Sequence, residues 1–140
     1  MAEISFHLED TIDHPFPTQE KEFITWLENV GKAELKNISS LTYIFCSDEY
    51  ILDINIKYLG HDYYTDIITF PYREGDDIES DLYISLERVK ENAEDFEVAF
   101  DEELKRVMVH GLLHLIGYSD KSEDDIHVMR EKENYYIATF

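Results

Sequence analysis

The ten residues from Val107 to Ile116 are the most apolar stretch of the chain, and they constrain its fold more than any other segment. A helix needs about 20 apolar residues to cross a bilayer, so this stretch is too short to span a membrane. Two histidines, His110 and His114, lie inside it. A helix from about Asp101 to Gly117 is therefore predicted, and we expect it at the centre of a folded domain.

Apolar residues in the rest of the chain follow either the period of strands or the period of helices. The predicted strands are Ile4–Leu8, Leu41–Cys46, Ile67–Tyr72 and Leu82–Leu86. The other predicted helices run from about Thr18 to Gly31, Ser47 to Gly60, Leu86 to Asp95 and Ser122 to Tyr136, with Thr18, Ser47 and Ser122 as N-caps. Because strands and helices do not alternate strictly, we expect one compact α+β domain over residues 1–140. It should hold a mixed sheet of about four strands, covered mainly on one face by about five helices.

The chain is strongly acidic, with 12 Lys and Arg against 32 Asp and Glu and a formal net charge of −20 at pH 7. This charge opposes binding to a phosphate backbone, which needs clustered cations, although an acidic excess also simply keeps a protein in solution. Cys46 is the only cysteine, which excludes an intramolecular disulfide and a CxxC metal site. The N-terminus shows no signal-peptide pattern. We expect a soluble, cytoplasmic protein without a membrane partner.

The spacing of the two histidines points to a metal site. Residues four apart lie on one face of a helix, so His110 and His114 can direct their imidazoles at one point. Gly117 can end the helix and turn the chain back, which brings Asp120 within reach as a third ligand. Three protein ligands leave one position of a tetrahedral zinc ion open for water. In the alternative interpretation, each histidine only bonds a backbone carbonyl in the core.

Zinc peptidases with the HExxH motif carry a glutamate next to the first histidine as general base. Gly111 occupies that position here, which disfavours a peptidase, and a glycine there allows another segment to approach closely. Glu103 precedes His110 by seven residues and so lies roughly on its face, but we assign it to the helix N-terminus, where it complements the dipole. Asp66 is assigned to turn chemistry before a strand.

Nine consecutive residues resemble the HGxLHLxGYDH signature of the YbeY-type bacterial rRNA maturation factors. They are His110-Gly111-Leu112-Leu113-His114-Leu115-Ile116-Gly117-Tyr118. The segment Asn55–Phe70 is similar to the part of that family leading into its TDVLSF-like strand, and Asp81–Ser85 is similar to its GDIxIS-like strand. Met129 falls where the last helix of the family usually carries methionine. The resemblance implies a single α+β domain and a metal-dependent endoribonuclease.

Two positions depart from the family pattern. The third metal ligand of the family is usually a histidine, and Asp120 stands at that position, where a carboxylate is still an acceptable zinc ligand. Leu59 replaces an arginine that the resemblance connects with the RNA reaction. Lys57 and His61 flank this gap, and our hypothesis is that one of them presents a cation to the scissile phosphate.

The sequence therefore supports two main functional hypotheses. In the first, one zinc ion held by His110, His114 and Asp120 serves a single-strand endoribonuclease that matures the 3′ end of small-subunit (16S) rRNA and takes part in ribosome quality control. In the second, the chain is a non-catalytic ribosome assembly factor with a structural metal, as the missing arginine and the net charge suggest. Both imply rRNA and the ribosome or ribosomal proteins as partners, without a small-molecule cofactor, and leave the oligomeric state open.

Overall fold

The computed structural model describes residues 2–11 and 13–140 and is built on a four-stranded sheet with strand order β1-β2-β4-β3. The strands β1 (Glu3–Leu8), β2 (Asn37–Cys46) and β4 (Asp77–Ser85) are parallel, whereas β3 (Ile67–Arg73) pairs antiparallel with β4. In this register Tyr43 of β2 lies between Phe6 of β1 and Leu82 of β4. The predicted mixed four-stranded sheet is confirmed.

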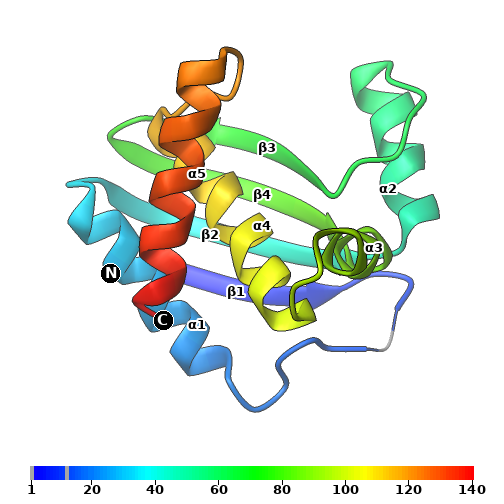
Figure 1. The fold of residues 1–140 in the computed structure, drawn as a ribbon, viewed down its shortest axis with the longest axis horizontal. Helices are drawn as coiled ribbons and strands as arrows, with labels where there is room; N and C mark the ends of the chain where they lie inside the picture. The colour runs from blue at the N-terminus through cyan, green and yellow to red at the C-terminus, as the bar shows by residue number, and fades with distance from the viewer. Residues whose placement is uncertain (1, 12) are drawn as a thin grey trace.

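The helices are α1 (Glu20–Ala33), α2 (Asp48–Ile54) with a π-helical turn over Asn55–Leu59, α3 (Leu86–Phe96), α4 (Phe100–Ile116) and α5 (Glu123–Ala138). Three of them, α1, α4 and α5, lie in front of one face of the sheet, with α4 between the strands and α5 (Figure 1). Helix α4 buries side chains around most of its circumference, among them Leu104, Met108, Leu112 and Leu113. The central position predicted for this helix is thus confirmed.

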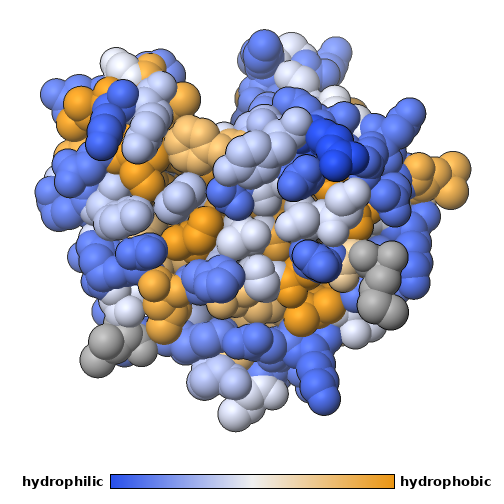
Figure 2. All heavy atoms as spheres, turned by 180° about the vertical axis from the view of Figure 1, so that it is seen from behind, coloured by the Kyte–Doolittle hydropathy of each residue, from blue (hydrophilic) through white to orange (hydrophobic). Residues whose placement is uncertain are grey.

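The other face of the sheet carries a smaller apolar cluster. There Ile51 and Ile54 of α2 pack with Cys46 and Ile68. Seen from this side, hydrophobic patches lie among hydrophilic residues over the sheet (Figure 2). The expected covering of the sheet mainly on one face is therefore observed. None of the helices described is long and apolar enough to cross a membrane.

Several predicted boundaries are correct and others are wrong. Ser47 and Ser122 cap α2 and α5 as predicted, because each side chain accepts a hydrogen bond from a backbone N–H three residues later. Thr18 does not cap α1, which begins after Gln19 without a side-chain cap. Gly31 does not end α1 either. A Cβ at Gly31 would lie 2.7 Å from Cδ1 of Ile38, so this glycine instead lets α1 approach the start of β2.

Candidate metal centre

The structure brings the three predicted metal ligands to one cavity. His110 and His114 lie one turn apart on α4, and Asp120 lies in the connection to α5. Together with Ile67 and Thr69 of β3 they line a hollow of about 180 Å³. Both histidines therefore line one cavity together with Asp120.

The ring of His110 lies beside the carboxylate of Asp120. Its Nε2 atom lies 3.6 Å from Oδ2 of Asp120. Two atoms bound to one tetrahedral zinc at about 2.0–2.2 Å lie roughly 3.3–3.6 Å apart, so this separation fits two ligands of one ion. His114 lines the cavity with an exposed side chain. In the conformation described for residues 2–11 and 13–140, no three His, Cys, Asp or Glu side chains converge on one point, so a three-ligand site requires these side chains to rearrange. The donor set of two imidazoles and one carboxylate is one that zinc accepts.

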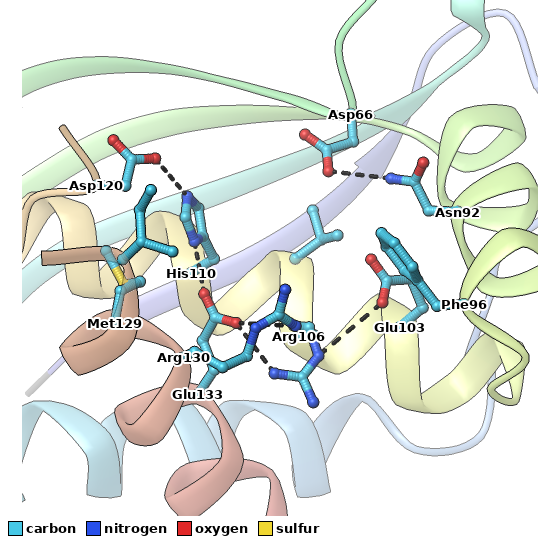
Figure 3. Close-up of a pocket in the computed structure, with 12 residues that line it drawn as sticks. Asp66, Asn92, Phe96, Glu103, Arg106, His110, Asp120, Met129, Arg130 and Glu133 are labelled. Atoms are coloured by element: carbon cyan, nitrogen blue, oxygen red, sulfur yellow. Dashed lines mark hydrogen bonds and ion pairs between the residues drawn. The ribbon is translucent and has the colours of Figure 1, made fainter. Parts of the chain in front are cut away.

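A buried carboxylate on α5 fixes the orientation of His110 (Figure 3). The Oε2 atom of Glu133 lies 2.7 Å from Nδ1 of His110, and its Oε1 atom accepts a hydrogen bond of 3.0 Å from Nη1 of Arg106. The hydrogen bond to Glu133 raises the pKa of His110, although burial of the ring opposes its charge. Burial opposes the charge of Glu133 as well, but the hydrogen bonds from His110 and Arg106 outweigh it and lower the pKa of the carboxyl. With Nδ1 engaged in this way, Nε2 is the nitrogen left for a metal.

His110 also lines a second cavity, of about 300 Å³. His110 and Asp120 line both cavities, so the two adjoin at the candidate metal ligands. The larger cavity is also lined by Asp66, by Asn92 and Phe96 of α3, by Glu103 and Arg106 of α4, and by Ile126, Arg130 and Glu133 of α5. Burial raises the pKa of both Asp66 and Glu103.

The turn after α4 places Asp120 beside His110. Gly117 has a positive φ of 130°, and its N–H bonds the carbonyl oxygens of Leu113 and His114, which ends the helix. The hydroxyl of Tyr118 then donates a hydrogen bond of 2.6 Å to Glu34 at the end of α1. Glu34 also accepts hydrogen bonds from Tyr136 and Lys132 of α5. This carboxylate therefore ties the turn to two helices and limits where Asp120 can lie.

Lys57 and His61 lie away from this centre. Lys57 lines a groove beside α2 and β3 with Tyr58, Tyr72 and Tyr83, and its Nζ atom lies 5.4 Å from the ring centroid of Tyr58. His61 is exposed and stacks on Tyr63. Neither residue lines the cavities that contain His110. Their proposed contact with a scissile phosphate stays a prediction, and it now requires an RNA strand that extends across this surface.

Sequence reasoning missed the roles of Glu133 and Asp66. The available signal for Glu133 was its spacing, because Met129, Glu133 and Tyr136 share the buried face of α5 and a carboxylate there needs partners. Asp66 was assigned to a turn, yet its side chain lines the larger cavity and accepts a hydrogen bond of 3.3 Å from Asn92. Glu103 does lie in the first turn of α4, as assigned, but it is buried and faces the same cavity as His110.

Gly111 allows α4 to lie close to the sheet under the two histidines. A Cβ at this position would lie 2.7 Å from Cδ1 of Ile67 and 2.8 Å from Cδ2 of Leu82. Gly111→Ala should therefore push α4 away from β3 and β4 and lower the free energy of unfolding by about 1–3 kcal/mol. Urea unfolding followed by tryptophan fluorescence measures this change. An unchanged unfolding midpoint would mean that the neighbouring side chains yield without cost.

Comparison with known proteins agrees with this fold. A family model described as Endoribonuclease YbeY matches residues 5–140. The chain is 52% identical over 122 residues to Endoribonuclease YbeY of Flavobacterium psychrophilum, covering 87% of each chain. It is 47% identical over 140 residues to Endoribonuclease YbeY of Flavobacterium johnsoniae, covering 100% of this chain and 97% of that one. The solution structure of TM1509 from Thermotoga maritima has a TM-score of 0.70 and 30% identity, and the match covers 96% of this chain and 86% of that one. On the strength of these matches, the chain belongs to the Endoribonuclease YbeY family.

Proposed function

We propose that this chain is a zinc-dependent endoribonuclease that cleaves single-stranded RNA and matures the 3′ end of small-subunit (16S) rRNA. The observation that carries the proposal is the cavity shared by His110, His114 and Asp120, with Nε2 of His110 3.6 Å from the Asp120 carboxylate. The names of the relatives supply the substrate class, since each is called an endoribonuclease. The proposed substrate implies action in the cytoplasm, with rRNA and the ribosome or ribosomal proteins as partners.

Some residues of the centre would bind the ion, and another orients one of its ligands. His110, His114 and Asp120 would hold the ion, and Glu133 keeps Nε2 of His110 directed into the cavity. A zinc ion held there would supply a water of lowered pKa and would polarise a phosphoryl oxygen. In the hydrolysis, the water would give up a proton as its oxygen bonds to phosphorus, and the leaving ribose oxygen would take up a proton as its bond to phosphorus breaks. Ile67 and Thr69 of β3 line the cavity beside these residues.

The net charge of −20 bears on how the RNA is brought to the site. Arg106 is occupied by Glu133 and Asn134, so it has little capacity left for phosphate. The guanidinium of Arg130 is half-exposed and lies 3.9 Å from Glu133. Because so few cations face the centre, we infer that the ion itself and a basic partner on the ribosome offset the repulsion between the chain and its substrate.

Asp120→Ala tests the ligand that departs from the family pattern. We expect the variant to lose most of its zinc, because two histidines alone seldom hold the ion against dialysis. Elemental analysis of wild type and variant after dialysis gives the zinc content per chain, which should fall from about one to well below one half. Asp124→Ala, which removes an exposed carboxylate in the first turn of α5, is the matched control and should keep its zinc. Full zinc in Asp120→Ala would remove this residue from the ligand set.

Cleavage itself is tested with the purified chain and a single-stranded RNA that carries the 16S 3′ end. The zinc-loaded protein should cut it, the protein stripped by a chelator should not, and added zinc should restore cutting. Activity that survives removal of all metal would contradict the proposal. Cleavage of casein at a comparable rate would instead favour the peptidase that Gly111 disfavours.

A non-catalytic assembly factor remains the second candidate. The larger cavity beside His110 is lined by two guanidinium groups and four carboxylates, those of Asp66, Glu103, Asp120 and Glu133. This excess of negative charge repels the phosphate of a phosphodiester. Leu59 also lacks the charge of the arginine found in the family pattern. A zinc-loaded protein that binds the small ribosomal subunit, yet leaves RNA intact in single-turnover assays, would favour this candidate.

A further inference from the structure

The larger cavity beside His110 has the properties of a binding site that the hydrolysis does not use. Its volume of about 300 Å³ falls at the lower end of small-molecule pockets, which span about 300–1,000 Å³. It adjoins the candidate metal cavity through His110 and Asp120. A group that enters it would therefore lie next to a phosphate held at the metal centre.

The polar atoms that this cavity offers to a ligand are mainly acceptors. Asp66 has one carboxylate oxygen bound to Nδ2 of Asn92, and its other oxygen points toward His110 and Asp120 (Figure 3). Glu103 is 3% exposed, and its nearest cationic atom, Nε of Arg106, lies at 4.0 Å. The N–H groups of Arg106 are already committed to Glu133 and Asn134. A fitting ligand must therefore bring hydrogen-bond donors of its own.

Two exposed apolar side chains stand on different walls of the same cavity. Phe96 at the end of α3 is 57% exposed, and Ile126 of α5 is 50% exposed. Both line the cavity, one from each helix. Phe96 lies beside Asn92 and Glu103, so its ring is close to the acceptors (Figure 3). A flat ring with an apolar face and a polar edge would cover these side chains while its edge meets the carboxylates.

We propose that this cavity binds a guanine base of the RNA, the base next to the cleaved phosphodiester, with Phe96 against its face and Asp66 accepting from its N1–H and N2–H groups. Guanine is the base with two adjacent donors on its Watson–Crick edge, whereas uracil has one donor between two acceptors. Flipped bases of single-stranded RNA are recognised in this manner, by stacking on aromatic rings and by hydrogen bonds to the Watson–Crick edge. The half-exposed Arg130 at the rim is available to a flanking phosphate. The inference rests on the proposed function for the origin of the base, but the binding can be measured without cleavage.

The test is a titration of the full-length, ¹⁵N-labelled chain with guanosine, adenosine, cytidine and uridine 5′-monophosphates, followed by NMR. The phosphate is common to all four, so differences in affinity report on the base. We expect a dissociation constant for the guanine nucleotide about 10-fold below that for the uracil nucleotide, with shifts of the Asn92 side-chain amide. Phe96→Ala should weaken all four nucleotides by a similar factor of about 5 or more, because stacking is tolerant of base identity.

Asp66→Asn should remove the preference for guanine without affecting the uracil nucleotide. The matched controls are Tyr135→Ala, which removes an exposed ring that lines neither cavity, and Asp62→Asn, which neutralises an exposed carboxylate four residues before Asp66. Both controls should bind as wild type does. Equal dissociation constants for the four nucleotides, or a guanine preference that survives Asp66→Asn, would overturn the inference.

These outcomes are separate from those of the proposed function. If the zinc-loaded chain cleaves RNA but shows no base preference, the inference alone fails. If guanine binds with the expected dependence on Phe96 and Asp66 but no cleavage occurs, the base site stands and the endoribonuclease proposal fails.

Discussion

His114→Ala is expected to lose zinc-dependent RNA cleavage by a factor of at least about 10³, because removing one of the three proposed ligands would remove several kcal/mol of metal-based stabilisation of the transition state. The side chain of His114 is exposed, unlike the apolar residues around it on α4. Truncation should therefore leave the free energy of unfolding within about 0.5 kcal/mol of wild type. Initial rates on a 16S 3′-end RNA, measured beside zinc content and thermal unfolding, separate loss of the site from loss of the fold.

His127→Ala is the matched control for this experiment. His127 is also an exposed histidine near the candidate centre in sequence, but it pairs with Glu131 on α5 at 2.9 Å and lines neither cavity. Its removal should change neither zinc content nor cleavage rate. If His114→Ala keeps both its zinc and its nuclease activity, His114 is not a ligand and the proposed centre is wrong.

Glu133→Ala should have the largest effect on stability. Glu133 is 5% exposed, so its removal leaves Arg106 and His110 without their buried partner. Breaking such a buried pair costs about 3–5 kcal/mol, and loss of the carboxylate behind a metal-binding histidine weakens zinc about 10- to 100-fold. Chemical denaturation gives the first quantity, and competition with a chromogenic chelator gives the second.

Glu133→Gln keeps the experiment informative if the alanine variant does not fold. The amide has the same shape, and its oxygen can accept from only one of the two partners, so we expect an intermediate loss of zinc affinity. Glu131→Ala, which removes an exposed carboxylate two residues away, should leave both quantities unchanged. Wild-type zinc affinity in Glu133→Gln, together with a folded protein, would show that Glu133 supports the helices and not the metal ligand.

The sequence predicted the elements whose apolar period is strong. Helix α4 was expected at 101–117 and lies at Phe100–Ile116, because its apolar residues are continuous and Gly117 stops it. The first residues of β2 and β4 were missed, since Asn37–Ser40 and Asp77–Asp81 are largely polar and resemble turns. In the structure, Ile38 and Ile78 of these segments are buried, and pairing with neighbouring strands extends both elements. Such pairing is tertiary information that local pattern does not contain.

The residues of the candidate site also fall into two groups, those that local spacing predicts and those that only tertiary packing brings together. His110 and His114 are predictable because a helix fixes their spacing, and Asp120 follows from the stop at Gly117. Glu133 meets His110 across 23 residues, and Asp66 joins the larger cavity from the segment before β3. No local spacing links these residues, because the packing of α5 and β3 against α4 brings them together.

The hydrogen bond that His110 donates to Glu133 makes the candidate centre depend on a docked α5. Asp120 lies just before α5 and Glu133 lies within it, so detachment of this one helix would remove both carboxylates from His110 together. A ligand that binds only when α5 is docked stabilises the docked state by mass action, so an ion at this centre would stabilise the packing of α5 against α4. Depletion of the ion should then raise amide hydrogen exchange in α5 before it affects the sheet. Under the proposed function, metal binding and the docking of α5 against α4 would therefore be coupled equilibria.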